Sequence, residues 1–293
     1  MSRKNACASA EFSLSYRTLI RVLFYSIVFV IGLLMLSRQS FGLNKALMDI
    51  HFYLAICVGF FAQIIDGTLG MAYGVSSTSF LLGLGIPPAA TSASVHMAEI
   101  FTTAVSGFAH LRFGNVNKTL LPKLLIPGVL GAVVGAYILT TLPGDTIKPF
   151  IAAYLFCMGL VILRKAVRQS AEQEVHTHLV PLGLAGGFFD AIGGGGWGPI
   201  VTSTLLARGN HLRFTVGTVN MAEFFVTCAA SLTFMVTIGL TNWQIILGLI
   251  IGGVAAAPLA AFLCKKLPVR LLMYVVGCII ILLSLRTIYL SFV

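Results

Sequence analysis

The sequence predicts an all-α membrane protein that crosses the bilayer several times. Of its 293 residues, 58% are hydrophobic and only 10% are charged, whereas soluble domains carry about 25% charged residues. Apolar stretches of about 20 residues, the length of a spanning helix, recur along the chain. So few charges cannot cover a water-exposed surface, which excludes a soluble enzyme or nucleic-acid-binding protein. The net charge of +10 does not alter this, because the basic residues form short clusters between apolar blocks.

Taken in order, the elements begin with an N-terminal region, residues 1–45, that holds an uncleaved first span at about 18–36. A first half covers 46–164, a polar linker 165–178 and a second half 179–293. Each half opens with an apolar stretch that a glycine-rich segment interrupts. The six cysteines show no C-x-x-C spacing, so neither a disulfide framework nor a zinc site is predicted. Three full spans follow each interrupted stretch, at about 92–111, 119–140 and 147–163, and at about 214–238, 243–263 and 270–290.

The two halves are related in sequence. Shifting the chain by 124 residues places Asp66 on Asp190 and keeps register to Phe108 on Leu232, with 15 identities in 43 pairs. The run Met97-Ala98-Glu99 recurs as Met221-Ala222-Glu223. This predicts one extra span followed by two repeats.

The loop charges predict that the repeats have opposite topology. Arg112, Lys118 and Lys123 lie near one loop of the first half, and the equivalent loop of the second half has no base. The other equivalent loops also carry opposite bias. Because basic residues favour the cytoplasmic side, we expect inverted repeats, with the N-terminus cytoplasmic and the C-terminus outside. The interrupted stretches either enter and return or cross fully.

The glycine-rich interruptions are the strongest candidate site. Irregular backbone at membrane depth persists only where protein or a water-filled cavity surrounds it. Short segments rich in serine and threonine follow each interruption. If these are half-helices, their N-termini could bind an anion without lysine or arginine; the alternative is tight packing of small residues. Tyr73 and Trp197 could close over a ligand or simply pack. The predicted substrate-binding residues are Gly70, Gly74, Ser76, Ser77, His96, Gly194, Gly195, Gly198, Thr202 and Asn220.

Four acidic residues lie in apolar blocks as two repeat-related pairs, Asp66 with Asp190 and Glu99 with Glu223. No lysine or arginine is expected at comparable depth. Acids inside a membrane usually line a pathway or pair with a neighbour, so we predict that they couple protons or support the site. The alternative is that each carboxyl caps backbone N–H groups at a helix break. His96 and Glu99 share a helix face, but Asn220 replaces the histidine in the second half, which disfavours a metal site.

These same stretches resemble the TauE/SafE sulfite exporter family, also called the toluene sulfonate uptake permease family. The matching segments are D-G-T-L-G-M-A-Y-G with A-S-V-H-M-A-E-I-F-T-T, and D-A-I-G-G-G-G-W-G-P with G-T-V-N-M-A-E-F-F-V-T. The resemblance covers about residues 50–290 and implies a multi-pass carrier of sulfur-containing anions in the bacterial cytoplasmic membrane. Leu69, Met71 and Ala72 stand where the second half has glycines, which departs from a pure glycine run, so we expect the two half-sites to be unequal.

We therefore predict a secondary transporter, an exporter of small sulfur-containing anions such as sulfite, sulfonates or thiosulfate. It is expected to need no cofactor and no nucleic acid, and a homodimer is left open. Four deep carboxyls would repel an anion. Either some are protonated, which makes proton coupling natural, or the protein carries a cation. A non-transporting membrane scaffold or receptor is the alternative from another class.

Overall fold

The computed structural model describes residues 50–112, 114–167, 178–208, 210–263 and 269–292. The chain divides into a unit of residues 1–43 and a unit of residues 44–293, and every described residue belongs to the second. The predicted first span at 18–36 lies outside the described residues, as does most of the predicted linker. Helix α7 continues to Val167, slightly past the predicted end of the first half.

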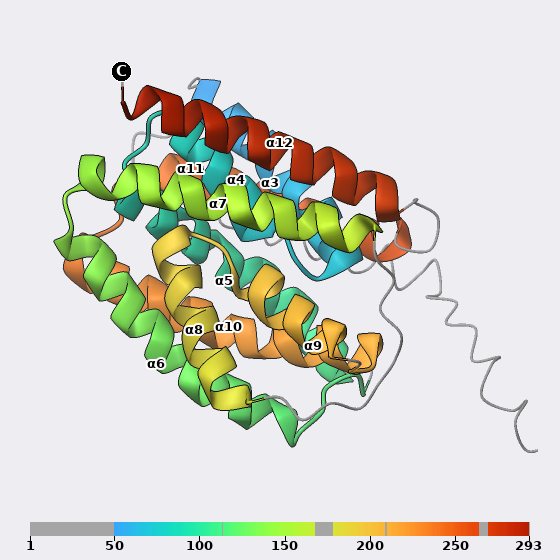
Figure 1. Cartoon of the computed structure of the whole chain (residues 1–293). Coiled ribbons are helices and arrows are strands. Elements are labelled where there is room, and N and C mark those ends of the chain that lie inside the picture. The colour runs from blue at the N-terminus through green and yellow to red at the C-terminus, as the bar shows by residue number, and fades with distance from the viewer. Residues whose placement is uncertain (1–49, 113, 168–177, 209, 264–268, 293) are drawn as a thin grey trace, which may run out of the picture. The chain divides into compact units, whose positions relative to one another are not determined.

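The described part of the chain is helical throughout and contains no strand, which confirms the all-α prediction (Figure 1). The first group of helices is α3 (Ile50–Leu69), α4 (Tyr73–Gly83), α5 (Pro88–Arg112), α6 (Leu120–Thr141) and α7 (Gly144–Val167). The second is α8 (Leu179–Gly193), the π-helix η1 (Gly198–Thr202), α9 (Ser203–Ala207), α10 (Leu212–Thr237), α11 (Trp243–Leu263) and α12 (Val269–Leu290).

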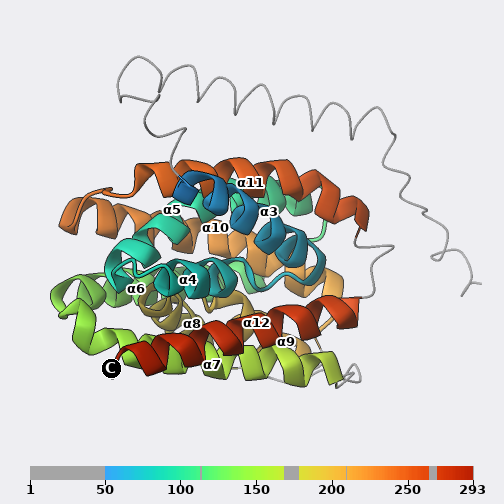
Figure 2. The same ribbon diagram turned by 90° about the horizontal axis from the view of Figure 1, so that it is seen from above.

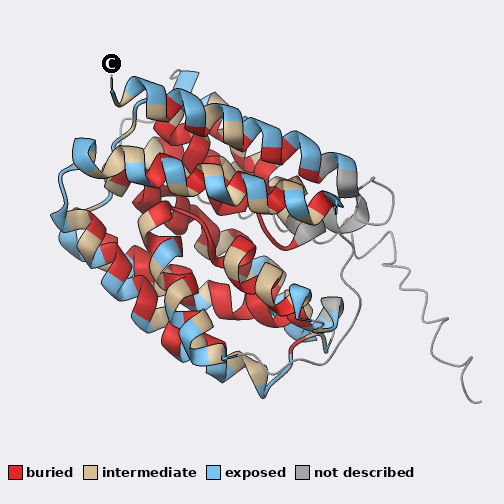
Figure 3. Cartoon of the chain, in the orientation of Figure 1, coloured by how far each residue is buried: buried red, intermediate tan, exposed pale blue. Residues whose placement is uncertain are grey.

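Four of the described helices are long and apolar enough to cross a membrane: Leu120–Thr141, Gly144–Val167, Phe214–Thr237 and Met273–Leu290. Their outward faces are apolar as well. Leu130 on α6, Phe150 on α7 and Leu282 on α12 are each more than half exposed, and Figure 3 shows buried residues on the inward sides of the helices. Surfaces of this kind suit contact with lipid rather than with water.

Helices of the two groups pack against each other rather than only within their own group. Helix α3 packs along α11, α8 along α6, α5 along α10, and α7 along α12; the last pair lies side by side in Figure 1 and Figure 2. Glycines allow the first two contacts. A Cβ at Gly59 would lie 2.9 Å from the Leu249 Cα, and one at Gly183 would lie 2.8 Å from the Leu124 carbonyl oxygen. Backbone therefore meets backbone at both crossings.

The helix boundaries follow the 124-residue register of the sequence. Pro88 and Leu212, which the register pairs, begin α5 and α10, and Leu69 and Gly193 end α3 and α8. The contacts follow it too, because α3 and α8, the first helix of each group, each pack on the third long helix of the other group.

Candidate functional site

Both predicted interruptions are real breaks between helices. Helix α3 ends at Leu69 and α4 begins at Tyr73, while α8 ends at Gly193 and η1 begins at Gly198. Gly70 and Gly194, which the register pairs, have nearly identical left-handed backbone, with φ of 66° and 65°. This conformation costs glycine little, which explains why the chain turns at these two positions.

The two breaks pack directly against each other in the interior. A Cβ at Gly74 would lie 2.6 Å from the Gly195 Cα, and one at Gly198 would lie 2.7 Å from the Met71 Cα. Hydroxyl groups join the breaks in the same paired way: Thr78 donates to the Gly194 carbonyl, and Thr202 donates to the Gly70 carbonyl at 3.4 Å. All five predicted binding glycines, with Thr202, therefore lie where one break packs against the other.

The two aspartates cap the helices that follow the breaks. The Asp190 Oδ1 accepts a hydrogen bond from the Trp197 backbone N–H at 2.8 Å, and the Asp66 Oδ1 accepts one from the Tyr73 N–H at 3.4 Å. Each carboxylate thus lies at a helix N-terminus, where negative charge is favoured. The sequence left open that these carboxyls cap backbone N–H groups at a helix break, and both aspartates do so here.

The aromatic residues inside the breaks pack rather than lie open. The Trp197 side chain is fully buried, and its Nε1–H donates to the Val219 carbonyl at 3.2 Å. The Tyr73 hydroxyl donates to the Leu249 carbonyl at 3.1 Å.

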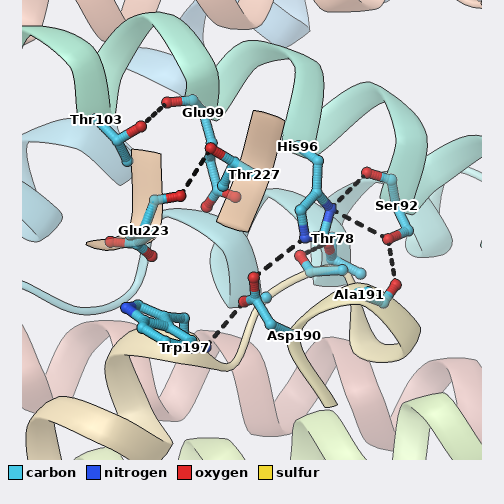
Figure 4. A network of polar contacts seen from close by, with 12 residues as sticks. Thr78, Ser92, His96, Glu99, Thr103, Asp190, Ala191, Trp197, Glu223 and Thr227 are labelled. Atoms are coloured by element: carbon cyan, nitrogen blue, oxygen red, sulfur yellow. Dashed lines mark hydrogen bonds and ion pairs between the residues drawn. The ribbon is translucent and has the colours of Figure 1, made fainter. Parts of the chain in front are cut away.

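His96 links α5 to α8. Its Nε2 lies 3.2 Å from the Asp190 Oδ2, and its Nδ1 lies 2.8 Å from the Ser92 carbonyl oxygen (Figure 4). The Ser92 hydroxyl crosses to α8 as well and donates to the Ala191 carbonyl at 2.6 Å. Asn220, the counterpart of His96 on α10, is buried as well, but its side chain is a neutral amide. The two halves therefore differ chemically at this position.

Glu99 and Glu223 lie in the same interior region, near the capped aspartates. Both are at least nine-tenths buried, and each main-chain carbonyl accepts a threonine hydroxyl one turn later, from Thr103 at 2.5 Å and Thr227 at 2.9 Å. The Glu99 carboxylate is within electrostatic range of Asp190, of Glu223 and of Asp66. Its Oε2 has no hydrogen-bond partner in the described part of the chain. All four predicted acids therefore form one cluster around the breaks.

Two predicted binding residues carry unused hydroxyls. Ser76 and Ser77 lie at the end of the first turn and the start of the second turn of α4, and neither side-chain oxygen has a hydrogen-bond partner among the described residues. Ser79, on the same helix, instead donates to its own helix at the Val75 carbonyl, 2.7 Å away. Buried hydroxyls are normally satisfied, so Ser76 and Ser77 are available for a ligand.

Two residues of α7 reach the breaks, and sequence reasoning did not select either. The Tyr154 hydroxyl donates to the Gly195 carbonyl at 3.2 Å, and the Lys165 ammonium lies 3.3 Å from the Met71 sulfur. Lys165 corrects the expectation that no base lies at this depth. In the sequence it belongs to a cluster next to the polar linker, but its long flexible stem allows the charge to extend away from the helix end. Its only partner among the described residues is a thioether, which is a weak acceptor.

A surface cavity of about 360 Å³ lies elsewhere, between α6 and α8. Its lining is mostly apolar and includes none of the predicted site residues.

Residues 55–287 match the family model described as "Sulfite exporter TauE/SafE". The chain belongs to the TauE/SafE sulfite exporter family. The matched region includes both breaks and all four clustered acids. It also includes all or most of every described helix. The resemblance seen in the motifs is therefore confirmed, and the chain is a membrane transporter of this family.

Two relatives of this TauE/SafE chain are likewise described as membrane transporters. It is 46% identical over 240 residues to "Probable membrane transporter protein YtnM" of Bacillus subtilis (strain 168), covering 78% of this chain and 80% of that protein. It is 28% identical over 204 residues to "Probable membrane transporter protein ORF9" of Sinorhizobium sp, and the alignment covers 66% of this chain and 71% of that protein. No solved structure matches the chain. None of these names specifies a substrate.

Proposed function

We propose that this TauE/SafE protein is a secondary transporter that exports small sulfur-containing anions, such as sulfite, sulfonates or thiosulfate, across the bacterial cytoplasmic membrane. The observation that carries the proposal is the crossing of two interrupted helices at Gly74 and Gly195 in the protein interior. Transporters commonly place substrate sites at discontinuous helices near the middle of the bilayer. A scaffold or receptor has no need for two such breaks.

The chemistry beside the breaks suits an anion. The first two turns of α4 carry the hydroxyls of Ser76 and Ser77, which bond to no described residue, near the positive end of the helix dipole. Lys165 brings a positive charge to Met71 in the first break. Hydroxyls, helix N-termini and an ammonium together form the donor set that oxygen-rich sulfur anions require.

We also infer that the two groups of helices are inverted repeats, with a cytoplasmic N-terminus and an external C-terminus. The opposite charge bias of equivalent loops supports this inference. The reciprocal packing of α3 on α11 and of α8 on α6 also fits it, because inverted halves related by an axis in the membrane plane exchange equivalent contacts.

Proton coupling follows from the acid cluster. Asp66, Glu99, Asp190 and Glu223 would together repel an anion if all were ionised. A proton bound within the cluster removes one negative charge and makes anion entry easier. The same acids provide the case for a cation transporter, which is the second candidate function.

The deciding experiment is flux into proteoliposomes that contain the purified full-length protein. Sulfite, methanesulfonate and thiosulfate are compared with Mg²⁺ and Mn²⁺. We expect flux of at least one sulfur anion and none of the metal ions. Metal-ion flux without anion flux supports the cation candidate, and no flux of any tested ion contradicts the transporter proposal for these substrates.

A matched pair of variants tests the binding hydroxyls. Ser77→Ala removes a buried hydroxyl that bonds to no residue in the described ranges, whereas Ser79→Ala removes one that its own helix already satisfies. A hydrogen bond to a charged group is worth about 1.5–3 kcal/mol, so we expect Ser77→Ala to raise the KM for the anion about tenfold or more. Ser79→Ala should leave KM nearly unchanged. Equal effects of the two substitutions would show that the Ser77 hydroxyl does not contact substrate.

A further inference from the structure

The hydrogen-bond geometry of His96 fixes where its protons are. The imidazole is completely buried, and its Nδ1 lies 2.8 Å from the Ser92 carbonyl oxygen. A carbonyl oxygen can only accept, so Nδ1 carries a proton and donates it. The Ser92 hydroxyl, 3.2 Å from the same nitrogen, gives its own proton to the Ala191 carbonyl and therefore also acts as an acceptor here.

The contact between His96 and Asp190 then needs a second proton. With Nδ1 protonated, a neutral imidazole presents a lone pair at Nε2, 3.2 Å from the Asp190 Oδ2. A lone pair facing a carboxylate oxygen is repulsive. The contact holds only if one proton lies between the two atoms, as imidazolium with carboxylate or as imidazole with carboxylic acid. In either form the pair has no net charge, and on losing the proton it carries one negative charge.

We infer that the His96–Asp190 pair holds the proton that couples transport, and that losing this proton releases α5 from the second break. This inference rests on the proposed anion transport and assigns its proton to one place. Asp190 Oδ1 also caps the Trp197 N–H at 2.8 Å. The proton therefore links the position of α5 to the start of η1, at the crossing of the two breaks.

The surroundings favour one coupling proton of this kind rather than two. In the other half, Asn220 replaces His96 and Val216 replaces Ser92. Asp66 keeps the cap on Tyr73 but makes no hydrogen bond to Asn220. The Asn220 side chain is a neutral amide that does not ionise, so Asp66 has no titrating partner at the equivalent place.

Other titratable groups lie in the same interior region around the breaks, and their effects must be separated from those of the pair. They are Glu99 on the same helix, Asp66 on α3, Tyr73 on α4, Tyr154 and Lys165 on α7, and Glu223 on α10. Glu99 is the essential control because it shares α5 with His96 and interacts electrostatically with Asp190.

Trp197 offers a readout that needs no substrate. The chain contains two tryptophans, so a Trp243→Phe background leaves Trp197, whose backbone N–H is bonded to Asp190. In purified full-length protein we expect loss of this proton to change Trp197 fluorescence with the slope of a single proton when the pH is varied from 5 to 9. Adding His96→Asn, which copies the residue of the other half, should abolish the transition, whereas adding Glu99→Gln should preserve it. A flat signal in the background protein, or a transition that survives His96→Asn, overturns the inference.

The transport arm uses methanesulfonate, whose charge does not change over this pH range. With the membrane potential clamped, one coupled proton supports about tenfold accumulation for each pH unit of gradient, because about 1.4 kcal/mol corresponds to a factor of ten. We expect His96→Asn and Asp190→Asn to abolish accumulation driven by the gradient, and accumulation is expressed relative to each variant's own exchange rate at equal pH. The amide in Asp190→Asn can still accept the Trp197 N–H and donate to Nε2, so it keeps the folded contacts without the exchangeable proton.

The two levels of proposal fail in different ways. Absence of methanesulfonate exchange in the wild type contradicts the proposed substrate class and leaves the Trp197 titration to decide on the pair. Accumulation that persists in both variants, with exchange intact, contradicts the coupling role of the pair even if the substrate class is right.

Discussion

The crossing of the two breaks can be tested with three alanine substitutions that separate crowding from backbone strain. Gly195 has φ of 147°, and a Cβ there would overlap the Gly74 carbonyl carbon and the Val75 nitrogen. Gly74 is helical, but its Cβ would lie 2.6 Å from the Gly195 Cα. Gly85 has φ of 86° and nothing within 4 Å of a Cβ. A side chain at Gly195 is therefore both crowded and strained in its backbone. A side chain at Gly74 is only crowded, and one at Gly85 is only strained.

The expected cost of each substitution follows from these contacts. Overpacking a close contact costs about 1–3 kcal/mol, and left-handed backbone costs a non-glycine residue about 1–2 kcal/mol. Gly195→Ala should therefore lower the free energy of unfolding by about 2–5 kcal/mol from the two terms. Gly85→Ala should cost about 1–2 kcal/mol. Gly74→Ala should lose stability through crowding, but alanine stabilises a helix by about 1 kcal/mol relative to glycine, which offsets part of this loss.

The assay is the fraction of monodisperse protein that remains after heating in one detergent, measured for the full-length chain. Gly195→Ala should lose stability most, and the two other variants should lose less. If Gly195→Ala is as stable as Gly85→Ala, the breaks do not pack as closely as the structure shows. A stable but inactive Gly195→Ala would instead support the prediction from the sequence that Gly195 belongs to the substrate-binding site.

Three further predictions concern topology, charge and capping. Single cysteines at Lys118 and Thr241, in a background without other cysteines, should react with an impermeant maleimide from opposite sides of the membrane; reaction from one side contradicts the inverted repeats. Lys165→Gln should raise the KM for a transported sulfur anion, with Lys123→Gln at the rim of the outer cavity as the control, and an unchanged KM means that the ammonium does not contact substrate. Asp190→Ala should destabilise the protein by about 0.5–2 kcal/mol through the lost helix cap, measured by the same heating assay, and stability equal to wild type means that the cap at Trp197 contributes little.

Much of the helical architecture was accessible from the sequence because apolar length and glycine punctuation are local signals. The spans predicted at 119–140 and 214–238 agree closely with α6 and α10. The breaks were found because a glycine run such as residues 193–196 cannot continue a helix cheaply. The predicted span at 92–111 lies within α5, a continuous helix whose many polar residues keep it out of the apolar group.

The site was predicted less completely, since contacts between distant residues leave no local pattern. The 124-residue register paired Asp66 with Asp190, but it could not show which backbone N–H each carboxylate accepts. It also could not show that His96 of one half reaches Asp190 of the other. Lys165 was overlooked because a base at a helix end normally points to water, and only the fold reveals that its ammonium turns toward Met71.

The pairing of α3 with α11 has a consequence for how the chain is made. Helix α3 is among the first described helices to leave the ribosome, whereas the backbone that fits against Gly59 is synthesised near the end, at Leu249. Until then, the face of α3 around Gly59 lacks its packing partner on α11. Such long-range contacts form slowly because the intervening chain must first be closed into a loop. Helix α3 should therefore insert into the bilayer well before it packs against α11. The interval is most of the time that translation of the chain takes. A chain that stops before α11 should insert but remain open to proteolysis.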